Sequence, residues 1–189
     1  NPGEPQVIRT VNGGTDWEDI SDPVFGGSNQ LRGIRALDAQ TAWVGGSSGT
    51  VFKTEDGGEN WAAAGTPPFT EAIWGMDNVG EQIWTVGGRF SIMYSPDGGD
   101  TWVGQNREAG APNDTDHTFN RIDAYDDQHL IVAGGQGRVM KTSDGGQNWE
   151  LVNTGVSVIL DGLTMFSPTH WIVVGFDGTI IETTDAGES

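Results

Sequence analysis

The side chains with the clearest potential for chemistry are the carboxylates of a motif that recurs five times. The motif places an Asp before a Gly pair and a Trp at positions 54–61, 95–102 and 142–149. A variant that carries Asn12 occupies 10–17, and a shortened copy occupies 183–189. Such oxygens could bind calcium, but that ion takes about six to eight oxygen ligands and each copy offers one carboxylate in this place. We therefore expect no metal site, and we predict that the carboxylates hold turns.

Turn chemistry accounts for each part of the motif. An Asp carboxylate accepts backbone N–H bonds from the turn that follows it, and the Gly pair adopts positive φ at little steric cost. The Trp is expected to pack between neighbouring units, with its N–H donating to a carbonyl. We expect structural roles in these turns for Asp56, Trp61, Asp97, Trp102, Asp144, Trp149, Asp185 and Trp17.

The spacing of the motif predicts the elements that position these residues. Successive copies are 41 to 47 residues apart, which suits four short strands and their turns. The intervening segments are β-branched, aromatic and punctuated by Gly, which excludes a solenoid of helix pairs. We predict an all-β protein, a β-propeller of four-stranded blades with about four to five blades here. Residues 1–189 form one unit on this interpretation, complete or part of a larger propeller.

Each repeat predicts the same series of strands. The inner strands are expected at 31–37, 72–76, 120–125 and 160–166, and the second strands at 42–46, 83–88, 130–135 and 171–175. The third strands are expected at 50–54, 91–95, 138–142 and 179–183, and short outer strands are expected to begin at Trp61, Trp102 and Trp149. Residues 7–20 are interpreted as a third and a fourth strand that open the chain.

These repeats resemble a known family. The run from Asp97 to Trp102 is similar to the Asp-box, or BNR, repeat, Ser/Thr-x-Asp-x-Gly-x-Thr-Trp. Residues 31–37, 42–46 and 49–61 together resemble the longer repeat of the photosystem II stability/assembly factor family. The resemblance implies a propeller that binds a protein partner. Members of that family usually have seven blades, which would need roughly 300 residues, so a larger propeller is expected.

Columns that differ between repeats predict where a ligand binds. Two apolar columns of the inner strands are expected to pack between blades, namely Ile34, Ile73, Ile122 and Leu163, and Leu37, Met76, Tyr125 and Phe166. Polar residues of inner strands border the central channel, where they can contact a ligand or only line it with solvated groups. The candidates for ligand or partner binding are Arg32, Arg35, Glu71, Trp74, Asn120, Arg121, Asp123 and Asp161. A long polar side chain also recurs in the third strand, as Arg9, Lys53, Tyr94, Lys141 and Glu182, and is expected to meet local carboxylates.

Composition excludes several classes of protein. The formal net charge of −18 repels phosphate backbones, so nucleic acid is not an expected partner. With no Cys, disulfide scaffolds, thiolate zinc sites and Cys nucleophiles are excluded. No apolar run is long enough to span a membrane. We also expect no cofactor. An extracytoplasmic location, whether secreted, periplasmic or lumenal, is the hypothesis that suits the charge and the resemblance.

The leading hypothesis for function is a non-catalytic binding or assembly scaffold for a protein partner. The alternatives are a carbohydrate-binding or sialidase-type propeller that uses Trp74, and a module of a larger secreted or cell-surface protein. A sialidase needs an Arg cluster and a Tyr nucleophile, and the sequence offers two Tyr, neither in a suitable place. The loop 105–118, which includes an Asn113 glycosylation sequon, is a candidate partner contact. An open propeller would also expose sheet faces, which predicts self-association.

Overall fold

The computed structural model describes residues 7–26, 29–106 and 115–188. This part of the chain forms 17 strands in five antiparallel sheets, joined by turns and short 3-10 segments. The N-terminal hairpin contains β1 (Ile8–Arg9) and β2 (Glu18–Asp19). The predicted all-β architecture of four-stranded blades is confirmed.

Four blades follow the hairpin. Blade 1 contains β3 (Leu31–Ala36), β4 (Ala42–Gly46), β5 (Val51–Thr54) and β6 (Ala62–Ala63). Blade 2 contains β7 (Ile73–Val79), β8 (Gln82–Gly87), β9 (Ser91–Ser95) and β10 (Val103–Asn106). Blade 3 contains β11 (Phe119–Ala124), β12 (Leu130–Gly134), β13 (Val139–Thr142) and β14 (Glu150–Val152). Blade 4 contains β15 (Leu160–Met165), β16 (Trp171–Gly175) and β17 (Ile180–Thr183).

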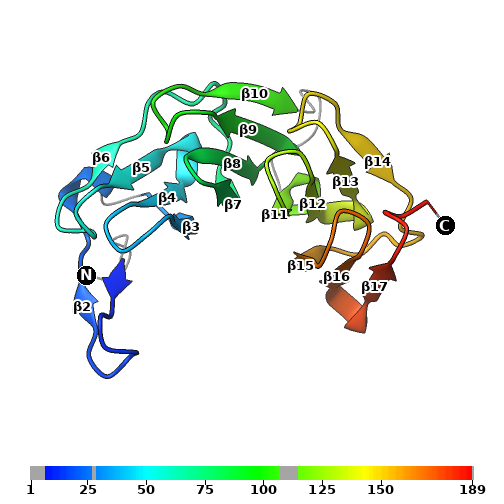
Figure 1. The fold of residues 1–189 in the computed structure, drawn as a ribbon, viewed down its shortest axis with the longest axis horizontal. Helices are drawn as coiled ribbons and strands as arrows, with labels where there is room; N and C mark the ends of the chain where they lie inside the picture. The colour runs from blue at the N-terminus through cyan, green and yellow to red at the C-terminus, as the bar shows by residue number, and fades with distance from the viewer. Residues whose placement is uncertain (1–6, 27–28, 107–114, 189) are drawn as a thin grey trace.

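The blades are arranged as an arc. The first strands, β3, β7, β11 and β15, lie along its inner edge, and the outer strands β6, β10 and β14 lie along its outer edge (Figure 1). The N-terminal hairpin stands at one end of the arc and blade 4 at the other (Figure 1). The outer strands begin one residue after each motif Trp rather than at it.

The core lies between blades rather than inside any one of them. Alternate residues of a strand point to opposite faces, and each inner blade packs against a neighbour on both faces. In β12, Leu130 and Val132 belong to the cluster shared with blade 2, while Ile131 and Ala133 belong to the cluster shared with blade 4. Strand β12 is therefore apolar and buried along its whole length, because both of its faces pack against other blades.

Each motif copy forms the same hydrogen-bonded turn. The Asp56 carboxylate accepts bonds from the Thr54 hydroxyl at 2.8 Å, the Asn60 backbone N–H at 2.9 Å and the Asn60 side-chain amide at 2.7 Å. Gly57 and Gly58 have φ of 74° and 97°, which favours Gly at both positions. In the first copy the amide and the carboxylate exchange places. Asn12 occupies the Asp position, and its side-chain amide donates to the Asp16 carboxylate at 2.8 Å.

The turns also join neighbouring blades. At the junction of the hairpin with blade 1 and at the three junctions between blades, the carbonyl of the residue after the motif Asp accepts a bond from the preceding unit. The donors and acceptors are Arg9 Nη1 to Gly57, Trp43 Nε1 to Gly98, Gln105 Nε2 to Gly145 and Lys141 Nζ to Ala186. Two motif Trp residues add a second link, as Trp61 Nε1 donates to the Ile20 carbonyl at 3.2 Å and Trp102 Nε1 to that of Ala64 at 2.9 Å. Trp17, which was also expected to pack between units, is 59% exposed on the hairpin.

Candidate functional site

The inner strands have a register that differs from the sequence-based alignment in the second repeat. Each inner strand contains an irregularity near its start, at 31–33, 73–75, 119–121 and 160–162. Opposite the second strands, Arg35 pairs with Trp43 and Asp77 with Trp84, so Asp77 is the counterpart of Arg35 in blade 2. The alignment of the second repeat was therefore wrong by three residues.

This correction changes the two apolar columns and the two polar columns expected from the sequence, which were Arg32, Glu71, Asn120 and Asp161, and Arg35, Trp74, Asp123 and Thr164. Ile73 and Met76 are the counterparts of Leu31 and Ile34, rather than of Ile34 and Leu37. The polar columns are Arg32, Trp74, Asn120 and Asp161, and Arg35, Asp77, Asp123 and Thr164. Glu71 precedes β7 and is buried, so it does not stand in the inner-strand column where it was expected.

Arg32 and Trp74 come together at the start of the inner strands. The guanidinium carbon of Arg32, on β3, lies 4.0 Å from the ring centroid of Trp74, on β7. Nη2 of Arg32 also donates to the Gln30 side chain at 2.6 Å. Arg32 remains exposed, so the stack holds the planar cation in place while leaving donors accessible.

Two further arginines lie at the same end of blades 2 and 3. Arg89, in the turn between β8 and β9, faces Glu71 with Nε and Oε1 3.6 Å apart. The guanidinium carbon of Arg138, at the start of β13, lies 4.1 Å from the ring centroid of Phe90. Arg89 and Phe90 have positive φ values of 55° and 52°, an uncommon conformation for side chains of this size.

Arg121 completes this group on β11. Its Nη2 lies 3.2 Å from the Asp161 carboxylate of the next blade, and its Nη1 donates to the Asn120 carbonyl at 2.8 Å. Asn120 is buried, and its side chain bonds the Thr118 hydroxyl at 2.6 Å and the Leu160 carbonyl at 3.4 Å. The start of the inner strands therefore collects Arg32, Arg89, Arg121 and Arg138, and we call this region the arginine end.

A ladder of carboxylates links the middle of the inner strands across blades. Asp77 accepts bonds from Arg35 Nε at 2.7 Å and from the Ala124 backbone N–H at 2.9 Å, so it joins blades 1, 2 and 3. Asp123 repeats the pattern by accepting the Met165 N–H at 2.7 Å. Burial raises the pKa of the Asp123 carboxyl, and the neighbouring Asp77 carboxylate raises it further. The sequence analysis missed Asp77 because of the error in the second repeat.

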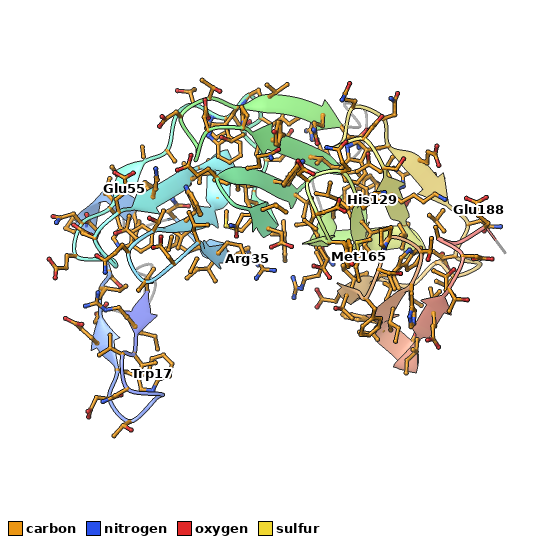
Figure 2. All side chains as sticks on the ribbon, in the orientation of Figure 1. Trp17, Arg35, Glu55, His129, Met165 and Glu188 are labelled. Carbon is orange, nitrogen blue, oxygen red and sulfur yellow. The ribbon has the colours of Figure 1, made fainter. Side chains whose placement is uncertain are left out.

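The opposite end of the blades is rich in carboxylates. Its cations Arg9, Lys53 and Lys141 form ion pairs with Glu18, Glu55 and Glu188 beside the motif turns, as expected for the third-strand column. We call this region the Asp-box end; Glu55 and Glu188 are labelled there in Figure 2. Within residues 7–26, 29–106 and 115–188, no group of three or more His, Asp or Glu could hold a metal ion. Most of the loop predicted as a partner contact, including Asn113, lies outside the described residues.

The fold and the repeated turn define a BNR-repeat β-propeller. Residues 75–162 match the family model described as photosynthesis system II assembly factor YCF48. The photosystem II assembly lipoprotein Ycf48 of Synechococcus sp. is 27% identical over 120 residues, which cover 62% of this chain and 35% of that relative. The chain is a BNR-repeat propeller that resembles the Ycf48 assembly factors, and it spans about a third of the length of that relative.

Two solved structures show the same fold at low sequence identity. A structure described as YCF48 bound to D1 peptide has a TM-score of 0.59 and 17% identity, over 79% of this chain and 51% of that one. The GH74 enzyme of Niastella koreensis has a TM-score of 0.74 and 16% identity, over 97% of this chain and 33% of that one. Among the described residues, no helix has the length and apolar character needed to cross a membrane.

Proposed function

We propose that this chain is a non-catalytic assembly scaffold that binds a segment of a partner protein at its arginine end. The observation that carries the proposal is its similarity to Ycf48 assembly proteins, one of which has been solved with a D1 peptide. Membership of the fold alone would not support this role, because GH74 enzymes share it. The proposal therefore depends on the chemistry of the arginine end.

That chemistry suits a carboxylate-bearing peptide. The chain has nine Lys and Arg residues against 27 Asp and Glu, yet four of the nine lie at the arginine end. Arg32 is exposed and stacked on Trp74, and the side chain of Arg121 is 45% exposed. An arginine held in a fixed orientation can bind a carboxylate through two parallel hydrogen bonds, which gives both affinity and direction.

The inner-strand carboxylates support a non-catalytic role. A pair of acids such as Asp77 and Asp123 could serve as general acid and base if both were free to exchange protons with a substrate. Both oxygens of Asp77 accept bonds from Arg35, Asn78 and Ala124, and Asp123 accepts one from Met165. These contacts give the carboxylates a function in holding blades together.

Two features support an extracytoplasmic module of a larger protein. The matched relative is named a lipoprotein, and this chain spans about a third of it. The chain also carries a formal charge of −18, which suits a surface exposed to solvent.

Fluorescence anisotropy with a labelled synthetic D1 peptide tests the proposal. The double variant Arg32→Ala/Arg121→Ala should weaken binding at least about tenfold, because two charge-assisted contacts are lost. Lys53→Gln is the matched control, since it removes a cation from the Asp-box end and should leave the affinity unchanged. Equal affinity in the double variant and the wild type would show that the arginine end is not the site.

The carbohydrate alternative can be examined with the same proteins. A sugar ring would stack on Trp74, whose ring already has Arg32 over it. Glycan-array binding by the wild type that disappears in Trp74→Ala, together with no D1-peptide binding, would favour a sugar-binding propeller and overturn the proposal.

A further inference from the structure

A second surface lies at the far end of the inner strands from the arginines. The residue that follows three of the inner strands is a large apolar one, namely Leu37, Tyr125 or Phe166. Each occupies the same structural position, because its N–H donates to a carbonyl four residues later, at 2.9, 3.0 and 2.8 Å respectively. In blade 2 the corresponding residue, Val79, ends the longer inner strand and packs against the core. We call Leu37, Tyr125 and Phe166 the apolar rim.

The exposure of the rim is intrinsic to the blades. Leu37, Tyr125 and Phe166 are 37%, 50% and 55% exposed, although this column was predicted to pack between blades. Tyr125 belongs to blade 3, which has a described blade on each side, so the end of the arc does not explain its exposure. The packing prediction was therefore wrong for Tyr125, and the reason is that this position lies beyond the sheet, in the turn.

The rim carries negative charge between its apolar residues. The turns that join first and second strands contain Asp38, Glu81, Asp126 and Asp127, and they contain no Lys or Arg. The motif turns lie beside them, because Gly57 N–H donates to the Gln40 carbonyl and Gly145 N–H to that of Gln128. The nearby cations Lys53 and Lys141 are already paired with Glu55 and Glu188.

The geometry of the arc sets a spacing for any ligand that crosses several blades. The inner strands of neighbouring blades come within 8 Å of each other between Cα atoms, packed sheet faces lie about 10 Å apart, and an extended chain advances about 3.3 Å per residue. One blade step therefore corresponds to about two to three residues of an extended peptide. Figure 2 places Arg35, near Leu37, and Met165, which precedes Phe166, along the inner edge of the arc, so the rim runs across the blades.

We propose that the apolar rim binds an extended, basic segment of a partner protein with an apolar side chain at about every second or third position. The apolar side chains contact Leu37, Tyr125 and Phe166, and the Lys or Arg residues between them face the turn carboxylates. Aromatic anchors with complementary charge around them are the usual composition of a peptide-binding surface. This surface is separate from the arginine end and would bind a segment of the opposite charge.

The probe is a fluorescein-labelled peptide of four Lys-Leu-Gly repeats, measured by anisotropy against the whole chain. Tyr125→Ser/Phe166→Ser should weaken its binding at least about fivefold, because two exposed anchors are lost without disturbing the core. Leu151→Ser is the matched control, since Leu151 is 65% exposed on the outer strand β14. Binding should also weaken in Glu81→Gln/Asp127→Asn and as salt is raised from about 0.1 M to about 0.5 M.

The experiment also separates the two surfaces. Arg32→Ala/Arg121→Ala should bind the Lys-Leu-Gly peptide as well as the wild type does, whereas a Glu-Leu-Gly peptide should not bind the rim. No measurable binding of the Lys-Leu-Gly peptide to the wild type would overturn the proposal. The same conclusion would follow if Leu151→Ser lost as much affinity as Tyr125→Ser/Phe166→Ser.

Discussion

Replacing Asp77 with Ala tests whether the inner-strand ladder holds the blades together. The Asp77 side chain is 13% exposed, and it accepts bonds from Arg35 at 2.7 Å, Asn78 at 2.9 Å and Ala124 at 2.9 Å. A hydrogen bond to a charged group contributes about 1.5–3 kcal/mol, so the two bonds to other blades contribute about 3–6 kcal/mol. Loss of the repulsion between Asp77 and Asp123 offsets part of this. We expect the free energy of unfolding to fall by about 3 kcal/mol.

Urea unfolding at pH 7, followed by Trp fluorescence and by far-UV circular dichroism, measures this change. Coincident transitions from the two probes would show that the arc unfolds as one unit, as the linear extrapolation requires. Asp161→Ala is the control, since Asp161 pairs with Arg121 at 3.2 Å on the surface and should contribute less than about 1 kcal/mol. If Asp77→Ala cost no more than Asp161→Ala, the ladder would not be a link between blades.

Three other variants test further contacts within and between blades, each by urea unfolding. Burial raises the pKa of Asp123, so the stability from this group is present at low pH and is lost as pH rises through the folded pKa. Asp123→Asn should therefore stabilise the protein at pH 7 and lose that advantage near pH 3. A lower free energy of unfolding for this variant at pH 7 would contradict the prediction. Hydrogen bonds from Asn60 and Thr54 lower the pKa of Asp56 from 3.8 to about 2, so the stability from this carboxylate is lost as pH falls through that window. Asp56→Asn should therefore reduce the fall in stability between these pH values. An unchanged dependence of stability on pH would show that these bonds do not lower the pKa of Asp56. Trp43→Phe removes the buried 2.8 Å bond to a carbonyl and should cost about 1–3 kcal/mol, whereas a neutral effect would mean the bond adds nothing.

The strands could be predicted from the sequence because turn chemistry marks their ends. The third strand expected at 50–54 is observed as Val51–Thr54, and that at 91–95 as Ser91–Ser95. The Asp-Gly-Gly turn ends each third strand at the predicted residue, the outer strands begin one residue later than expected, and the inner strand expected at 72–76 is observed as Ile73–Val79. Local hydrogen bonds from Asp and positive φ at Gly act within a few residues, so they can be inferred without knowledge of the tertiary structure.

The register of the second inner strand could not be predicted from apolar spacing. Ile73 and Met76 are three residues apart, as are Leu31 and Ile34, because the irregularity in the strand shifts the alternation by one residue. Sliding the repeat by three therefore preserves the apolar pattern and misplaces the polar residues. Matching Gly33 with Gly75 would have given the observed register and would have found Asp77.

The exposure of Tyr125 depends on tertiary structure in a different way. An aromatic residue at the end of an apolar strand predicts burial, yet the chain turns at this residue and the side chain leaves the sheet. The ion pair between Arg121 and Asp161 likewise joins residues forty positions apart, and no local signal in the sequence specifies it. The candidate site could be placed on the inner strands from the sequence, but its contacts could not.

The bonds between successive blades bear on how a chain of this kind can lengthen in evolution. At every described junction the motif turn of the later unit accepts a bond, through its carbonyl, from a donor on the earlier unit. Duplication of a whole repeat would insert a unit that fits both neighbours, whereas loss of half a repeat would leave a donor or a carbonyl unmatched. The donor differs between units, since Trp43 supplies it in blade 1 and Gln105 in blade 2, where Tyr94 stands in place of the cation and bonds Gln82. Recombination should therefore preserve each donor together with the motif turn that follows it.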